Sequence, residues 1–324
     1  MIELVERAQS RTVRVFAIAL LRRDYAEDLR RLPLRRARGL LRSPHDEVQT
    51  FAAELLRNAS GVQNLSIEEW LDLLRIDNPN ALPLLCELVE KTVRPERLSL
   101  AQAVELACAR AAPVAELGLR WAKQKPVNDE AALATVLGLV RAGAPQVRAE
   151  GIAWVTEILA KVSFGKPEHV RDLLDARFAD VRAHGLALVE KDARFQASTV
   201  LWGALAESPY DDARAFLVRH LRDREKSFGP ETLRQVWATS LLAVHRGGRA
   251  KRTALNQIAA RIAHKPAEAE SLLPLLGIAL RSVRAPERRT ALAAVASAAV
   301  REPSLTRAIE RVLPDLKVER EAVL

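Results

Sequence analysis

The sequence predicts an all-α protein, folded as a right-handed α-solenoid of about eight to nine helix pairs. Three observations predict this class. One short segment returns about every 33 residues, apolar residues recur at fixed helical offsets after each return, and runs with strand-like alternation are nearly absent from the 324 residues. Periods of this length are typical of stacked units that are each too small to bury an apolar face alone.

The repeat is visible in the last residue of the recurring segment, which we call the marker. The successive steps between markers are 33, 33, 33, 34 and 32 residues. The markers are Val48, Ala81, Val114, Val147, Val181 and Ala213. So regular a step over six copies predicts an array of similar units.

A helix, called helix B, is predicted to follow each marker. The residue at +4 is small in four units (Ala52, Gly118, Gly151 and Gly185), and the residues at +5 and +8 are mostly apolar. These offsets place one apolar stripe on a helix of about 15 residues. The small residue should let the preceding helix approach closely.

A second helix, helix A, is predicted before each marker. The expected ranges are 67–74, 100–109, 130–139, 169–174 and 199–205. Two of them start with a capping box, Ser66 with Glu69 and Ser99 with Gln102, in which a hydroxyl and a carboxylate or amide satisfy unpaired backbone amides. Pro167 suits a first helical turn, where its missing amide proton costs nothing.

The register lengthens towards the C-terminus. The segment 252–255 (Arg-Thr-Ala-Leu) returns at 289–292, a step of 37 residues, which places markers at Lys251 and Arg288. We therefore predict a single α-solenoid over residues 1–324. Residues 1–43 form Arg-rich N-terminal capping helices, 44–300 the repeats and 301–324 a C-terminal cap.

Two turn-plus-helix segments resemble HEAT or HEAT-like repeats. They are residues 144–153 (Ala-Pro-Gln-Val-Arg-Ala-Glu-Gly-Ile-Ala) and 179–187 (Ala-Asp-Val-Arg-Ala-His-Gly-Leu-Ala). In that family an Asp or Pro turn leads into a Val-Arg pair and a small-residue helix. The resemblance, over residues 40–300, implies that the B helices line a concave binding face. It also implies that Arg148, Arg182 and Arg214, at +1, form a structural ladder with turn aspartates.

Composition favours a cytoplasmic protein. No run reaches the ~18 apolar residues of a membrane span, and Glu3 and Glu6 stand where a secretory signal carries positive charge. The only two cysteines, Cys86 and Cys108, fall within predicted helices and are expected to be reduced thiols of the core.

We find no pattern for a catalytic site, a cofactor or a small-molecule substrate. None of the six histidines has the i, i+4 spacing of a helical metal site, so no metal is predicted. Glycine-rich phosphate loops and nucleophile elbows are also missing from the sequence. Trp121 and Trp154 both stand at +7, where other units carry leucine, so the tryptophans are interpreted as core residues.

Positive charge is the remaining signal for a binding site. The chain has 50 Lys and Arg against 41 Asp and Glu, a net charge of +9. Residues 11–42 hold ten arginines and three acids. A second cluster of basic residues should form a ridge along one edge of the solenoid, suited to an anionic partner. The ridge residues are Arg246, Arg249, Lys251, Arg252, Arg281, Arg284, Arg288 and Arg289.

The sequence therefore predicts a non-enzymatic scaffold or adaptor that binds a protein along its concave face. The alternative is a protein that binds duplex DNA, related to the HEAT-like DNA glycosylases. Those enzymes need an exposed carboxylate among aromatic and Arg side chains, which the sequence does not locate. Binding to random duplex DNA that is lost between low and moderate salt would favour the alternative. A third possibility is a piece of a larger repeat protein with uncapped apolar ends.

Overall fold

The computed structural model describes residues 1–221, 229–242 and 248–316, and every regular element in these ranges is a helix. The all-α prediction is confirmed. The chain divides into two compact units, Met1–Gly165 and Lys166–Leu324. We describe each unit separately.

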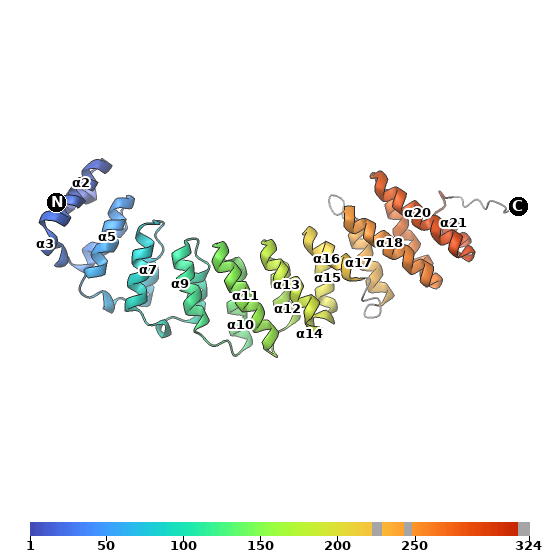
Figure 1. Ribbon diagram of the computed structural model, residues 1–324, viewed down its shortest axis with the longest axis horizontal. Coiled ribbons are helices and arrows are strands. Elements are labelled where there is room, and N and C mark those ends of the chain that lie inside the picture. The colour runs from blue at the N-terminus through green and yellow to red at the C-terminus, as the bar shows by residue number, and fades with distance from the viewer. Residues whose placement is uncertain (222–228, 243–247, 317–324) are drawn as a thin grey trace. The chain divides into compact units, whose positions relative to one another are not determined.

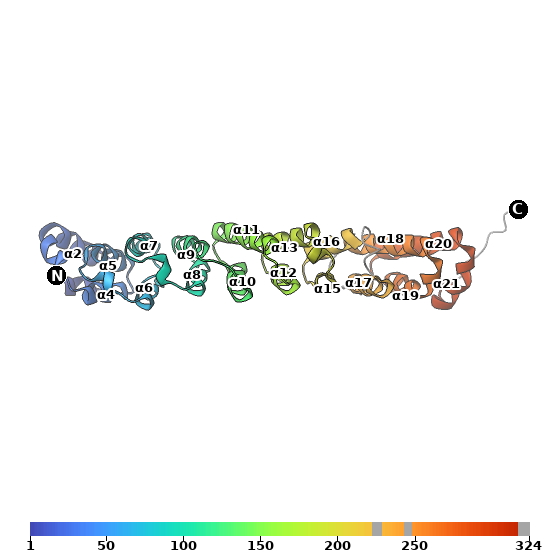
Figure 2. The ribbon, with the colours of Figure 1, turned by 90° about the horizontal axis from the view of Figure 1, so that it is seen from below.

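The first unit begins with α1 (Ile2–Arg7), α2 (Arg11–Asp24) and α3 (Ala26–Arg30), and paired helices follow. The A helices are α4 (Leu34–Leu41), α6 (Ile67–Leu73), α8 (Leu100–Ala107) and α10 (Glu130–Leu137), and the B helices are α5 (Asp46–Asn58), α7 (Ala81–Thr92), α9 (Ala112–Lys123) and α11 (Pro145–Lys161). Helix α4 packs on α5 and α8 on α9, while α5, α7, α9 and α11 pack on one another in chain order. The A and B helices form two layers of this unit (Figures 1 and 2).

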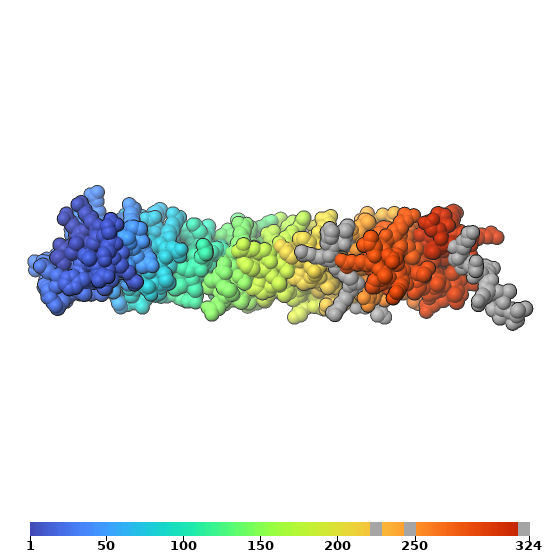
Figure 3. All heavy atoms as spheres, turned by 90° about the horizontal axis from the view of Figure 1, so that it is seen from above, coloured from blue at the N-terminus to red at the C-terminus, as the bar shows by residue number. Residues whose placement is uncertain are grey.

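The second unit repeats this arrangement. Its A helices are α12 (Pro167–Leu174), α15 (Thr199–Glu207), α17 (Pro230–Leu242) and α19 (Ala269–Leu280), and its B helices are α13 (Ala179–Lys191), α16 (Asp211–Leu221), α18 (Gly248–His264) and α20 (Ala285–Arg301). Two further helices are α14 (Ala193–Gln196) and α21 (Thr306–Val312). Each A helix packs on the B helix that follows it, and neighbours within each layer pack in chain order. The colour bands of Figure 3 show the same order within the unit.

The predicted A helices begin at or within two residues of the expected positions. Both capping boxes are confirmed. The Ser66 hydroxyl accepts from the Glu69 amide at 3.1 Å and the Glu69 carboxylate accepts from the Ser66 amide at 2.9 Å, and Ser99 and Gln102 exchange the same two bonds. Pro167 is the first residue of α12. Local capping chemistry thus sets these helix starts.

The small residues at +4 lie where A and B helices approach closely. A Cβ added to Gly118 in α9 would come within 2.3 Å of the backbone nitrogen of Ala107, the last residue of α8. A Cβ on Gly185 would stand 2.9 Å from the Leu173 Cβ of α12. The predicted reason for these glycines is confirmed, because a larger residue would push the two helices apart.

Two of the arginines at +1, Arg182 and Arg214, pair with an aspartate as the resemblance implied. Arg182 is 6% exposed, and its Nη1 donates to the carbonyls of Ala176 and Arg177 at 2.8 and 3.1 Å. The same guanidinium pairs with Asp212 of the next B helix at 2.9 Å. Arg148 and Arg214 also donate to carbonyls five or six residues back, as do Arg14 and Arg288. These cations tie each turn to the following helix.

The predicted register of the last two repeats is wrong by one residue. The markers lie two residues after a helix start in α5, α11 and α13, but Lys251 and Arg288 lie three residues after the starts of α18 and α20. Ala250 and Glu287 are therefore the equivalent positions. This shift places Ala254 and Ala291, both 0% exposed, at +4, and Lys251 and Arg288 at +1. The Arg-Thr-Ala-Leu match identified the step of 37 residues but not its phase.

Four of the five tryptophans are core residues, as predicted. Trp70, Trp121, Trp202 and Trp237 are at most 3% exposed. Trp154 is half-buried, so the equivalence of Trp121 and Trp154 is wrong. The offset +7 lies at the edge of the apolar stripe, where burial varies with the neighbouring helix. Cys86 is buried and Cys108 partly buried, and both are free thiols, as expected.

An ion pair at the start of α19 predicts a pH effect on stability. Glu268 accepts two bonds of 2.7 Å from Arg261, which is 4% exposed, and these bonds hold the pKa of Glu268 below its ordinary value. The pair therefore stabilises the fold fully above the unfolded glutamate pKa of about 4.3, and this contribution is lost as the pH falls through the lowered pKa. We expect Glu268→Gln to lower the free energy of unfolding by about 1–2 kcal/mol at pH 7.

Urea unfolding from about pH 6 to about pH 3 tests this expectation. The difference between wild type and Glu268→Gln should shrink as the pH falls. Glu207→Gln removes an exposed carboxylate of the same unit and is the control. A difference that stays constant with pH would show that the ion pair is not responsible.

Candidate functional site

The Arg-rich N-terminal segment is largely ion-paired. Of its ten arginines, eight have a carboxylate oxygen within 4.0 Å, and these are Arg11, Arg14, Arg22, Arg23, Arg30, Arg36, Arg38 and Arg42. Several of the pairs join neighbouring helices, as when Arg22 of α2 meets Glu54 of α5 at 2.6 Å. The segment is therefore a poor candidate for attracting an anionic partner.

Ion pairs also cross the B helices of the first unit. Arg57 of α5 meets Glu87 of α7 at 3.5 Å, Arg120 of α9 meets Glu90 of α7 at 3.0 Å, and Lys123 of α9 meets Glu150 of α11 at 2.6 Å. Each pair is solvent-exposed and contributes at most about 1 kcal/mol. Together they give this layer a charged and internally compensated surface.

The predicted basic ridge is only partly formed. Arg246 and the side chain of Arg249 lie outside the described residues. Lys251 is 6% exposed, and its Nζ stands 3.8 Å from the Glu287 carboxylate, so it is a buried structural cation. Lys251 occupies at +1 the place of the buried Arg182, whereas Arg288 at the same offset is exposed.

The other ridge residues are exposed. Arg284 stands 3.8 Å from Glu287, and Arg288 donates to the Ser282 carbonyl at 2.8 Å. The remaining exposed arginines are Arg252 on α18, Arg281 after α19, and Arg289 on α20. The structure brings Arg281, Arg288 and Arg289 to the rim of one cavity.

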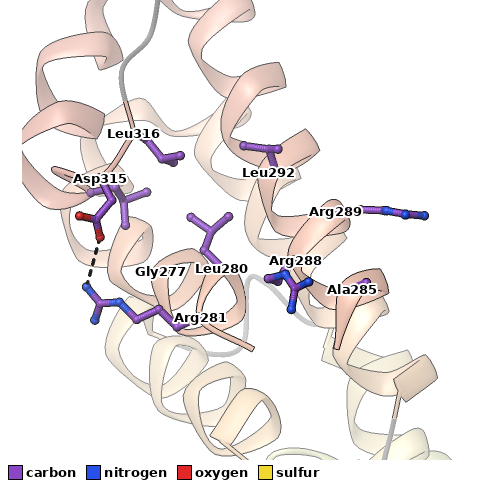
Figure 4. Close-up of a pocket in the computed structure, with 10 residues that line it drawn as sticks. Gly277, Leu280, Arg281, Ala285, Arg288, Arg289, Leu292, Asp315 and Leu316 are labelled. Carbon is purple, nitrogen blue, oxygen red and sulfur yellow. Dashed lines mark ion pairs between the residues drawn. The ribbon is translucent and has the colours of Figure 1, made fainter. Parts of the chain in front are cut away.

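This cavity, which we call the α19–α20 groove, has a volume of about 460 Å³. Its apolar lining includes Leu280, Leu292 and Leu316 (Figure 4). Leu313 completes this lining. Gly277 lies at the base, and a Cβ added there would approach the Leu313 Cδ2 to 2.8 Å. The glycine therefore lets the chain after α21 close against α19.

Charge at the rim is mostly positive. Arg281 reaches towards Asp315 across the groove, with 4.0 Å between nitrogen and oxygen (Figure 4). Their side chains are 79% and 87% exposed, so water screens this pair strongly. Figure 4 shows Arg289 extending from α20 away from the cavity. Arg281, Arg288 and Asp315 thus stand around the apolar lining, and Arg289 projects outward from the same rim.

The outer face of α20 continues from the groove. Leu292, which lines the groove, is 50% exposed, and Val300 two turns later is 80% exposed. Between them the exposed residues Ala293, Ala296 and Ser297 are small and uncharged. Arg289 and Arg301 mark the two ends of this face. An uncharged helix face bounded by arginines contrasts with the ion-paired B helices of the first unit.

Sequence reasoning found the arginines of the groove but missed its leucines and the α20 face. The available signal was that residues 291–300 are apolar around the whole helix, with only Ser297 interrupting them. A helix that is apolar on every side either is fully buried or presents an interaction surface. The pattern alone does not choose between the two.

The rest of the described chain offers little reactive chemistry. Burial raises the pKa of the Cys86 thiol to about 11, so this thiol stays protonated. Among the described residues, no cluster of three or more His, Cys, Asp or Glu side chains could hold a metal ion, and no helix has the length and apolar character of a membrane span. Comparison with protein-family models and with curated proteins finds no match.

Proposed function

We propose that the chain is a HEAT-like, right-handed α-solenoid and acts as a non-enzymatic cytoplasmic scaffold. It binds a protein partner through its B helices, with the α20 face as the main contact. The observation that carries this proposal is that Leu292 and Val300 are exposed on one face of α20. The exposed residues between them on this face are small and uncharged. Large apolar residues grouped on a surface are typical of protein interfaces.

The energetics of the face support protein binding. Complete burial of a Leu or Val side chain contributes about 1.5–3 kcal/mol, and both side chains are at least half exposed before binding. The small residues Ala293, Ala296 and Ser297 would allow a partner backbone to come close. In the first unit, a partner would have to displace ion pairs such as Arg120 with Glu90.

Two asparagine substitutions test the proposal without changing charge. We expect Leu292→Asn with Val300→Asn to reduce the recovery of a specific partner at least about tenfold in quantitative affinity purification. A tenfold loss corresponds to about 1.4 kcal/mol, less than the expected burial of two aliphatic side chains. Both positions are exposed, so the fold should be retained, which circular dichroism would check.

Phe16→Asn is the matched control. Phe16 is 64% exposed on α2 in the first unit, so the substitution also removes an exposed apolar side chain. The control should recover the partner as the wild type does. If every protein recovered by the wild type is retained by the double variant, the α20 face is not the binding surface.

Duplex DNA binding is the second candidate function. The observation that favours it is the exposure of Arg252, Arg281, Arg288 and Arg289 in one unit. Phosphate contacts would need only such cations. Against it, the groove lined by Arg281, Arg288 and Arg289 also has an apolar lining of leucines, which suits a protein side chain better than a phosphate.

A further inference from the structure

We propose that the α19–α20 groove binds a short acidic, leucine-containing segment of a partner protein. The inference rests on the proposed function and adds the chemistry of the partner. An apolar side chain of the segment enters the groove, and its carboxylates meet Arg281 and Arg289. The segment continues along the α20 face, which the groove adjoins through Leu292.

The size and lining of the groove suit an aliphatic anchor. Its volume of about 460 Å³ lies within the range of binding clefts, about 300–1,000 Å³. Leu280 comes from α19, Leu292 from α20, and Leu313 and Leu316 from the chain after α21, so three segments surround the anchor. An apolar lining with a few charged groups at the rim is typical of clefts that bind a partly apolar ligand.

The positive charge at the rim favours acidic residues on either side of the apolar anchor in the partner segment. Arg281 lies at the rim beside Asp315, and Arg289 extends outward from α20 at the same rim, while Asp315 is the only carboxylate among the described residues that line the groove. Because Asp315 and Arg281 are 4.0 Å apart and highly exposed, an incoming carboxylate can replace Asp315 at little cost. Arg288 is held by the Ser282 carbonyl and gives the groove a fixed positive charge.

The same geometry disfavours a nucleic acid in this groove. Proteins that bind single strands or splayed bases use aromatic side chains as stacking platforms. The lining residues include none, and an aliphatic floor offers a phosphate no hydrogen bond. The groove therefore suits a ligand that combines acidic groups with an apolar side chain.

Fluorescence anisotropy with a designed peptide tests the inference on the full-length protein. The probe is a fluorescein-labelled helical peptide of about 12 residues, the length of the α20 face, with leucine at every third or fourth position and glutamate elsewhere. A second peptide carries glutamine in place of glutamate. We expect the glutamate peptide to bind at least about fivefold more tightly, with an advantage that declines as salt rises from about 50 to 300 mM.

Three Arg→Gln variants separate the groove from the general positive charge. Arg281→Gln and Arg289→Gln should each weaken binding of the glutamate peptide about threefold or more. Arg252→Gln removes the same charge from an exposed position on α18 outside the groove, and binding should stay within about 1.5-fold of wild type. Leu292→Asn should weaken both peptides.

Each outcome decides between the alternatives. Equal binding of the two peptides, or equal losses in Arg252→Gln and Arg289→Gln, would overturn the groove as an acidic-peptide site. If random-sequence duplex DNA displaces the peptide and all three Arg→Gln variants lose DNA binding alike, the surface serves nucleic acid instead. A partner that is lost with Leu292→Asn and Val300→Asn while both peptides bind equally would leave the proposed function intact and refute only this inference.

Discussion

Gly118→Ala is expected to destabilise the protein by about 3 kcal/mol, the upper end of the usual cost of overpacking. The added Cβ would lie 2.3 Å from the Ala107 nitrogen and 2.6 Å from the Leu106 carbonyl carbon and Cβ. All three distances involve atoms that no side-chain rotation can move. Helices α8 and α9 must therefore separate, and the apolar contacts between them are lost. Urea unfolding and hydrogen exchange of both helices would measure the effect.

Gly39→Ala is the matched control for Gly118→Ala. Gly39 lies inside α4, and a Cβ added there would have no neighbour within 4 Å. Alanine is the better helix former by about 1 kcal/mol, so this variant should be as stable as the wild type or slightly more stable. If the two variants have the same stability, close packing at Gly118 is not the reason for the glycine.

Arg182→Ala is expected to cost about 3–4 kcal/mol, because it removes one partner of a largely buried network. The substitution leaves the carbonyls of Ala176 and Arg177 without their donor and Asp212 without its cation. It also removes the stacking of the guanidinium on Tyr210, at 3.7 Å from the ring centroid. The free energy of unfolding in urea would show the loss.

Arg234→Ala provides the comparison for Arg182→Ala. Arg234 pairs with Glu231 one turn away on α17, and both side chains are well exposed. Such a pair contributes less than about 0.5 kcal/mol. If Arg182→Ala is as mild as Arg234→Ala, the +1 arginines are surface residues that happen to meet carbonyls, and their structural role is refuted.

The helix pairs could be predicted from sequence because their signals are local. Ser66 and Ser99 cap their helices through residues three positions away, and Gly118 and Gly185 stand at a fixed helical offset. The resemblance implied a structural role for the +1 arginines, and in the structure Arg182 and Arg214 bond to the turn just before them. Each of these features depends on residues that lie close together in the chain.

The features that could not be predicted depend on neighbouring repeats. Trp154 matches Trp121 in offset, but its burial depends on what the adjacent helices place around it. The charge of Lys251 predicts a surface position, although Glu287, 36 positions away, lies beside it in the interior. The groove combines residues of α19, α20 and the chain after α21 that share no motif.

In the described parts of both units, the helices that pack most extensively on one another lie close together in the chain, and this has a kinetic consequence. In both units the packed elements follow one another closely, as α5, α7 and α9 do, and α16, α18 and α20 do. The relative contact order is therefore low, and loop closure costs little entropy at each step. Folding can start at more than one place in the chain and spread outward, which favours rapid folding for a chain of this length.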